Sequence, residues 1–137
     1  MKRLPRTEHA LVLRTDFSDD AAWGALCANI QTPHGLFLAS VSCVSDRDYD
    51  AASPDAIVAA AGADGEDNFR SYLFIVDRVA LTPGGAVLVL DLFDEPGLTF
   101  RVVPAQLGSV ENNLSLGNMD FRDFRDAAGP DEIFRGF

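Results

Sequence analysis

Three hydrophobic stretches separated by turn-forming residues constrain the fold of this chain most strongly. They span residues 72–81, 86–93 and 98–103. Thr-Pro-Gly-Gly at 82–85 separates the first two, and Asp-Glu-Pro-Gly at 94–97 separates the last two. Pro-Gly suits the centre of a type II turn, because glycine accepts the positive φ of the second central position. Short turns join antiparallel neighbours, so the pattern predicts a meander of strands.

The N-terminal part carries signals for a strand, a helix and a second strand. Residues 10–15 are mainly apolar and predict the first strand. Ser18 is the expected N-cap of the following helix, whose apolar side chains recur at three-to-four spacing as far as Ile30. Alternation at residues 37–43 predicts another, half-buried strand.

A second helix is signalled after an acidic loop at residues 46–50. Ser53 is a good N-cap, Pro54 fits the first helical position, and Gly62 is a suitable end. The sequence therefore places a short helix between the second strand and the meander.

The C-terminal part predicts two more helices. Leu107 and Leu114 lie at helical spacing in a segment that can end at Gly117. Asn118 then fits the N-cap of the last helix. The final residues, 133–137, contain two phenylalanines, which favours a C-terminus packed on the body of the protein.

Together these signals give the order β-α-β-α-β-β-β-α-α. This order predicts an α+β fold with an α/β-like N-terminal half, in which a mixed sheet of about five strands is packed against helices. A length of 137 residues suits one compact domain over residues 1–137. We expect residues 1–8 to form a flexible N-terminus.

The charge balance restricts the classes of partner. The chain has 21 Asp and Glu against 11 Lys and Arg, a net charge of -10 that repels nucleic acid and anionic membrane surfaces. It suits a protein partner, in particular a basic one. No stretch approaches the roughly 20 apolar residues that span a bilayer.

The cysteines and histidines predict neither a metal site nor a cofactor. Cys27 and Cys43 are too few for a disulfide framework and form no Cys-x-x-Cys pair, which favours a reducing cytoplasm. His9 and His34 have no partner at metal-ligand spacing.

A carboxylate pair beside an arginine is one candidate catalytic cluster. If the first meander turn is centred near Gly84, Asp77 lies opposite Asp91, and if the second is centred near Pro96, Asp91 lies opposite Arg101. Two close carboxylates beside a cation suit acid/base chemistry. Cross-strand charge pairs also simply stabilise sheets, and that structural interpretation stays open.

The polar segment 109–121 is the second candidate, because two carboxylates and three amides interrupt an apolar helix pattern there. These groups either satisfy helix ends and loop backbone or form a recognition site. Asp16, in the acidic junction between the first strand and helix, lies where open α/β sheets often bind ligands, although helix capping explains it too. The candidate binding residues are Glu111, Asn112, Asn113, Asn118 and Asp16, and Glu111 with Asp120 is an alternative acid/base pair.

Several segments resemble an uncharacterised family of small acidic actinobacterial proteins, classed as a domain of unknown function. They are RTDFSDDAAW (14–23), FIVDR (74–78), DEPG (94–97), RVVP (101–104), residues 109–121 and FRGF (134–137). The resemblance covers nearly the whole chain and is weakest at residues 46–68. It implies no activity, cofactor or catalytic residue.

The sequence thus favours a non-enzymatic cytoplasmic binding or regulatory module that recognises a protein partner through an acidic surface. This interpretation rests on the small size of the chain, its negative charge and the lack of a catalytic motif. Two alternatives stay open. One is a metal-independent hydrolase or isomerase of a small molecule that uses the carboxylates named above, and the other is a structural homodimer.

Overall fold

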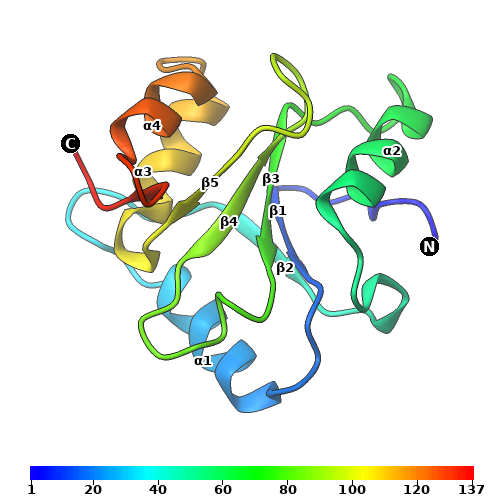
Figure 1. The fold of residues 1–137 in the computed structure, drawn as a ribbon, viewed down its shortest axis with the longest axis horizontal. Helices are drawn as coiled ribbons and strands as arrows, with labels where there is room; N and C mark the ends of the chain where they lie inside the picture. Colours follow the sequence, from blue (N-terminus) through cyan, green and yellow to red (C-terminus); the bar gives the residue numbers. More distant parts are fainter.

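The computed structural model describes residues 1–137 and contains a six-stranded sheet of order β2-β1-β3-β4-β5-β6. The predicted mixed sheet with packed helices is confirmed, with one further strand at its end (Figure 1). The elements are β1 (Ala10–Arg14), α1 (Asp20–Ile30), β2 (Val41–Val44), the 3-10 helix η1 (Arg47–Tyr49), α2 (Pro54–Asp64), β3 (Tyr72–Val76), β4 (Val87–Asp91), β5 (Thr99–Val102), α3 (Pro104–Ser115), α4 (Phe121–Ala127) and β6 (Ile133–Phe134).

Strand β1 lies at the centre of the parallel part of the sheet. Its Val12 is paired with Cys43 of β2 on one side and with Phe74 of β3 on the other. The chain therefore crosses from β1 through α1 to β2, and then through α2 back over β1 to β3. These parallel connections need a crossover, and the first two helices supply it, as the sequence predicts.

The meander is confirmed, but its registers differ from the prediction. Asp91 lies opposite Tyr72 rather than Asp77, and Arg101 lies opposite Leu88 rather than Asp91. The physical reason is that both aspartates act in the turns. Asp77 accepts a hydrogen bond from the backbone N–H of Ala80 (3.1 Å), and Asp91 accepts one from that of Phe93 (2.9 Å).

Helices cover the sheet on both faces, so there are two apolar cores. In Figure 1, α2 stands on one side of the sheet and α3 and α4 on the other. Phe74, on one face of β3, belongs to the larger core, which also contains residues of α1, α3 and α4. Leu73, on the other face, belongs to the smaller core with Ile57 of α2. Burial of both faces explains why all of β3 is apolar.

The helix starts depart from the sequence prediction at two places. Asp19, not Ser18, caps α1 and accepts from the N–H of Ala22 (2.9 Å), because the Ser18 hydroxyl donates to Asp16. Asp120, not Asn118, precedes α4, and its N–H donates to the carboxylate of Asp123 (2.9 Å). The N–H of Asn118 instead closes the end of α3 on the carbonyl of residue 113 (3.0 Å).

The start of α2 agrees with the prediction, whereas its end does not. Ser53 caps the helix and accepts from the N–H of Ala56 (3.1 Å), with Pro54 in the first turn. The helix continues past Gly62 to Asp64 and ends at Gly65, which has a φ of 57°. A glycine at positive φ after the last helical residue is a common way to end a helix.

Both ends of the chain lie against the body of the protein. At the N-terminus, where we expected a flexible segment, Leu4 is buried and its carbonyl accepts from Asn68 (3.2 Å). At the C-terminus, β6 pairs parallel to β5, and Phe134 is completely buried, in agreement with the predicted packing of the tail.

Candidate binding site at the amino ends of the parallel strands

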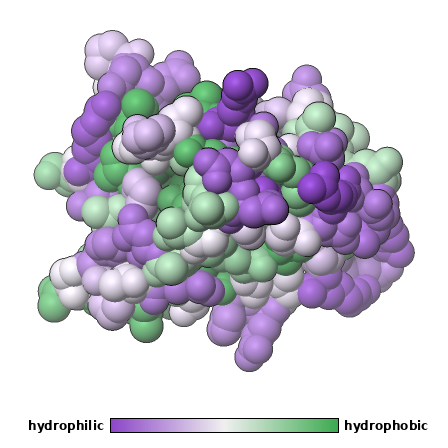
Figure 2. Space-filling view, turned by 90° about the horizontal axis from the view of Figure 1, so that it is seen from below, coloured by the Kyte–Doolittle hydropathy of each residue, from purple (hydrophilic) through white to green (hydrophobic).

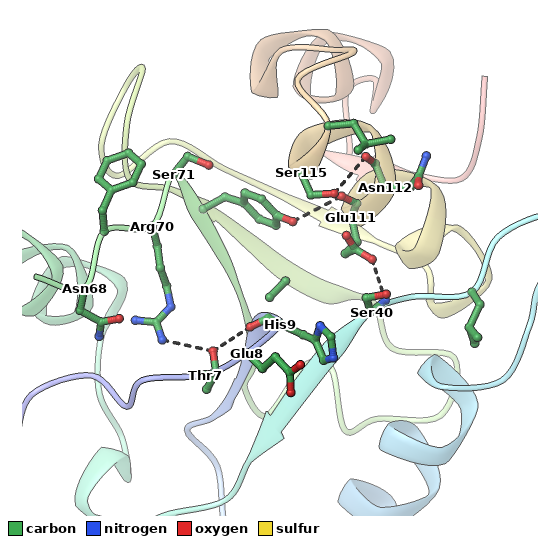
Figure 3. A pocket seen from close by; sticks show the side chains of 15 residues that line it. Thr7, Glu8, His9, Ser40, Asn68, Arg70, Ser71, Glu111, Asn112 and Ser115 are labelled. Carbon is green, nitrogen blue, oxygen red and sulfur yellow. Dashed lines mark hydrogen bonds between the residues drawn. The ribbon is translucent and has the colours of Figure 1, made fainter. Parts of the chain in front are cut away.

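A cavity of about 590 Å³ opens at the end of the sheet where the parallel strands begin (Figure 3). Four segments that are distant in sequence form its walls. They are the approach to β1 (Thr7, Glu8, His9, Ala10), the approach to β2 (Leu38, Ser40), the approach to β3 (Asn68, Phe69, Arg70, Ser71, Tyr72) and the end of α3 (Glu111, Asn112, Ser115, Leu116). Its volume lies within the usual range for small-ligand pockets.

Glu111 forms the polar centre of one wall. Helix α3 directs Leu107 and Val110 into the core, and Glu111 follows on the flank of that face, where only 6% of the residue is exposed. One carboxylate oxygen accepts from the N–H of Ser40 at 2.6 Å, and no protein donor bonds to the other. Glu111 also forms no ion pair. The fold therefore holds a buried carboxylate with spare acceptor capacity beside a cavity.

Tyr72 lies on the floor of the cavity next to Glu111. Its hydroxyl donates to the backbone carbonyl of Glu111 at 3.4 Å, a long hydrogen bond. Burial, with a contribution from the charge of Glu111, raises the pKa of Tyr72 above its ordinary value. Tyr72 therefore stays neutral at physiological pH, as a donor that orients the end of α3.

Arg70 forms the opposite wall, and the sequence analysis did not single it out. Its Nη2 donates to the carbonyl of Pro5 and to the hydroxyl of Thr7 (3.3 Å), whereas Nη1 is buried without a hydrogen-bond partner. Burial lowers the pKa of Arg70, and the charge of Asp64 partly offsets this effect. The only local signal for this role is a basic residue two positions before a fully buried strand.

Arg70 differs from the other arginines that are not exposed. Arg14, Arg101 and Arg125 each form an ion pair with a carboxylate, at 2.7 to 2.8 Å. Arg70 forms none, although the chain has 21 acidic residues. Arg70 therefore has no carboxylate in direct contact at the wall of the cavity, and only the nearby charge of Asp64 acts on it.

Exposed apolar side chains form the rim of the cavity. Leu38, Phe69 and Leu116 all line it and are 57%, 63% and 66% exposed. The ring of Phe69 also meets that of Phe93 edge-on, with centroids 5.7 Å apart, and Phe93 is itself exposed. An apolar rim around a polar centre is a surface that can be desolvated by a partner.

The structure separates the candidates of the polar C-terminal segment. Asn112 lines the cavity, and its side-chain amide has no hydrogen-bond partner in the protein. Asn113 does not line it, because its amide donates back to the carbonyl of Ser109 at 2.9 Å. Asn118 is exposed in the turn after α3. Of the five predicted binding residues, the cavity therefore brings together only Glu111 and Asn112.

A smaller cavity of about 180 Å³ lies next to the first and shares Ser71 and Tyr72 with it. Asp91 and Asp120 both line this smaller cavity. Each oxygen of Asp91 accepts from a backbone N–H of the following turn, at 2.9 Å. Asp120 is exposed at the start of α4.

The predicted cluster of two aspartates and Arg101 does not form. Asp77 and Arg101 form a bidentate ion pair, with N–O distances of 2.7 and 3.0 Å. Asp91 is bonded to its own turn and takes no part in this contact. The register difference is the cause, since it moves Asp91 along the sheet away from Arg101. What remains is an ion pair that ties the β3–β4 loop to β5.

Asp16 lies at the other end of the sheet, outside both cavities. Its carboxylate accepts from the hydroxyl and the N–H of Ser18, and these bonds hold the pKa of Asp16 below its usual range. Beside it, the buried Arg14 donates to the carbonyl of Asp16 and to Asp20, both at 2.8 Å. Figure 2 shows this end of the molecule, where hydrophilic residues cover much of the surface.

No group of three or more His, Cys, Asp or Glu residues is arranged to hold a metal ion. His9 lines the larger cavity, whereas the ring of His34 is in hydrogen-bond contact with the carbonyl of Asn29 at 3.0 Å. Cys27 and Cys43 are free and half buried. No helix is both long and apolar enough to cross a membrane.

The model of the family described as "Domain of unknown function (DUF6924)" matches residues 9–137, so the chain belongs to this family. The resemblance to an uncharacterised family is thus confirmed over nearly the whole chain. No curated protein matches the sequence. The matched range includes Arg70, Tyr72 and Glu111, while the family description assigns no function to any of them.

Proposed function

We propose that this protein is a non-enzymatic binding module, and that it recognises a protein partner through the larger cavity and its apolar rim. Glu111 is the observation that carries the proposal. A buried carboxylate without a cation is costly, because burial removes the water that would solvate it. A basic side chain of the partner would supply the missing donor to its free oxygen. Asn112 adds an unpaired amide beside it.

The charge of the whole chain supports a basic partner. A net charge of -10 attracts cationic proteins over several ångströms and raises their association rate at low salt. The rim residues Leu38, Phe69 and Leu116 would lose water on contact and seal the polar centre. Interfaces in which apolar contacts exclude water from a buried charged anchor are typical of tight protein recognition.

The test compares partner retention by wild type and by Glu111→Gln at low salt. Glutamine keeps the acceptor for Ser40 but removes the charge that a basic side chain needs. Asp55→Asn is the matched control, since it makes the same charge change at an exposed position of α2. We expect wild type and the control to retain the same protein, with affinity falling as salt rises, and Glu111→Gln to lose it. Equal retention by all three, or no dependence on salt, would contradict the proposal.

A small-molecule hydrolase or isomerase is the second candidate, and the smaller cavity favours it. Two of the candidate acid/base carboxylates, Asp91 and Asp120, line that cavity next to Tyr72. Against it, both oxygens of Asp91 are occupied by backbone donors. Turnover of ester, amide or isomerisable substrates that disappears in Asp120→Asn would support this candidate. Equal turnover in the variant would exclude Asp120 as its acid/base group.

The remaining expectations stay predictions. A structural homodimer is compatible with partner binding, and the solution mass from light scattering tests it. Cytoplasmic location rests on the cysteine usage, and actinobacterial origin rests on the family resemblance.

A further inference from the structure

The two walls of the larger cavity carry opposite charges that do not neutralise each other. Arg70 lies on one wall and Glu111 on the other, and neither forms an ion pair within the protein (Figure 3). In the figure, the side chain of Arg70 runs down its wall towards Thr7, while Glu111 points towards Ser40. A ligand that carries an anion and a cation a short distance apart would compensate both walls at once.

The anion that suits the Arg70 wall is a carboxylate. Nη2 is held by Pro5 and Thr7, which fixes the guanidinium in place, and its charge acts across the wall in a region of reduced solvent. Ser71, the next residue, adds a hydroxyl that has no partner in the protein and lines the same cavity. A phosphate is a poorer match, because Glu8 and Glu111 line the cavity as well and would repel a dianion.

The cation that suits the Glu111 wall is a lysine or arginine side chain. The free oxygen of Glu111 and the side-chain carbonyl of Asn112 can accept hydrogen bonds from it. The C-terminus of a polypeptide presents both groups on one free chain end, because its α-carboxylate lies within one or two residues of a basic side chain. An internal segment would have to bring chain in and out of the cavity on both sides.

We propose that the cavity takes the C-terminus of the partner polypeptide, with the α-carboxylate facing Arg70 and Ser71 and a basic side chain of the last residues facing Glu111. This inference rests on the proposed function, since it names the part of the protein partner that enters the same site. The apolar rim, with Leu38, Phe69 and Leu116, then contacts the residues that precede the terminus.

The experiment uses pools of acetylated pentapeptides with lysine or arginine at the last or next-to-last position and all residues elsewhere. One pool has a free C-terminal carboxylate, the second a C-terminal amide, and the third has norleucine in place of the basic residue. We expect the immobilised wild-type protein to enrich the free-acid pool by about tenfold over both others, the effect of one charge-assisted hydrogen bond. Equal enrichment of acid and amide pools, or of none, would overturn the inference.

Three arginine variants locate the effect. Arg70→Gln is expected to lose the preference for free acid over amide, whereas Arg78→Gln, the same change at an exposed position near the other end of the sheet, keeps it. Arg70 also ties down the N-terminal segment, so Arg70→Lys is included, and we expect it to keep part of the preference because the charge remains. A preference unchanged in Arg70→Gln would overturn the role of Arg70.

Three further outcomes separate this inference from its rivals. If free lysine displaces the peptides at equal concentration, the cavity is a small-molecule site and the inference is wrong. If the partner is retained through Glu111 while acid and amide pools are enriched equally, the proposed function stands and the C-terminal inference falls. If neither peptides nor partner depend on Glu111, both fall.

Discussion

The two ends of the sheet differ in whether their buried charges form ion pairs. At the carboxyl ends of β1 and β3, Arg14 is 3% exposed and all its nitrogens have partners: the carbonyl of Asp16, the hydroxyl of Ser45 and the carboxylate of Asp20. Its guanidinium also lies 4.4 Å from the centre of the Phe17 ring. Charge at this end is used to hold β1, the start of α1 and the end of β2 together.

At the amino ends, Arg70 and Glu111 face a cavity and keep unused hydrogen-bonding capacity. Open α/β sheets usually bind ligands at the carboxyl ends of their strands, next to the point where the strand order reverses. Here the chain's own ion pairs fill that place. The comparison indicates that the position of unpaired charge, more than the topology of the sheet, identifies the candidate site.

The largest expected effect tests the carboxyl end. Arg14→Met removes three charge-assisted hydrogen bonds and the contact with Phe17, while it keeps an apolar stem of similar length. We expect the free energy of unfolding to fall by about 3 kcal/mol in urea titration. A loss below about 1 kcal/mol would mean that this arginine does not hold the junction together, and the contrast between the two ends would weaken.

A smaller loss is expected for the neighbouring ion pair. Asp77→Asn breaks the two-fold contact with Arg101, and its amide can replace only one acceptor. We expect a loss of about 1–2 kcal/mol in the same titration, with no change in partner retention. Loss of partner binding in this variant would place function at the carboxyl end and contradict the comparison.

Variants in the turn between α3 and α4 test whether Asp120, as in the structure, or Asn118, as the sequence predicts, caps α4. Asp123→Ala removes the acceptor for the N–H of Asp120, and we expect it to cost about 0.5–1 kcal/mol. Asn118→Ala removes an exposed side chain that makes no hydrogen bond, so we expect this variant to have the same melting temperature as wild type. The reverse result would restore Asn118 as the helix cap.

The smallest effect concerns pH. The pKa of Asp16 is lowered in the folded state, so its ionised form stabilises the fold above the unfolded pKa, and this contribution is lost as pH falls through the folded value. We expect the stability difference between wild type and Asp16→Asn to shrink below about pH 4. A difference that stays constant between neutral and acid pH would show that the bonds from Ser18 do not favour the ionised carboxylate.

The sequence predicted the elements better than their pairing. Local signals such as Ser53-Pro54, or leucines at helical spacing in α3, depend on neighbours in the chain and were confirmed. The register of β4 depended on where two turns begin, and Asp77 and Asp91 shift both turns by bonding to backbone N–H groups. Strand β6 has two residues, too few for any periodicity.

The candidate site was predicted only in part for a similar reason. Glu111 attracted notice because a carboxylate within an apolar helix pattern is unusual on its own. Arg70 did not, because its significance depends on Pro5 and Thr7, more than 60 residues away, and on the absence of an ion pair with any carboxylate. Such a tertiary cavity leaves almost no local signal in the sequence.

The central claim is that the charge of Glu111 is kept for a partner and does not stabilise the fold. The most direct test is the free energy of unfolding of Glu111→Gln, because glutamine keeps the acceptor for Ser40 and removes only the charge. We expect a free energy of unfolding within about 0.5 kcal/mol of the wild-type value, or above it, as is usual where function opposes stability. A loss of about 2 kcal/mol or more would contradict it, since Glu111 would then be a structural carboxylate like those at the other end of the sheet.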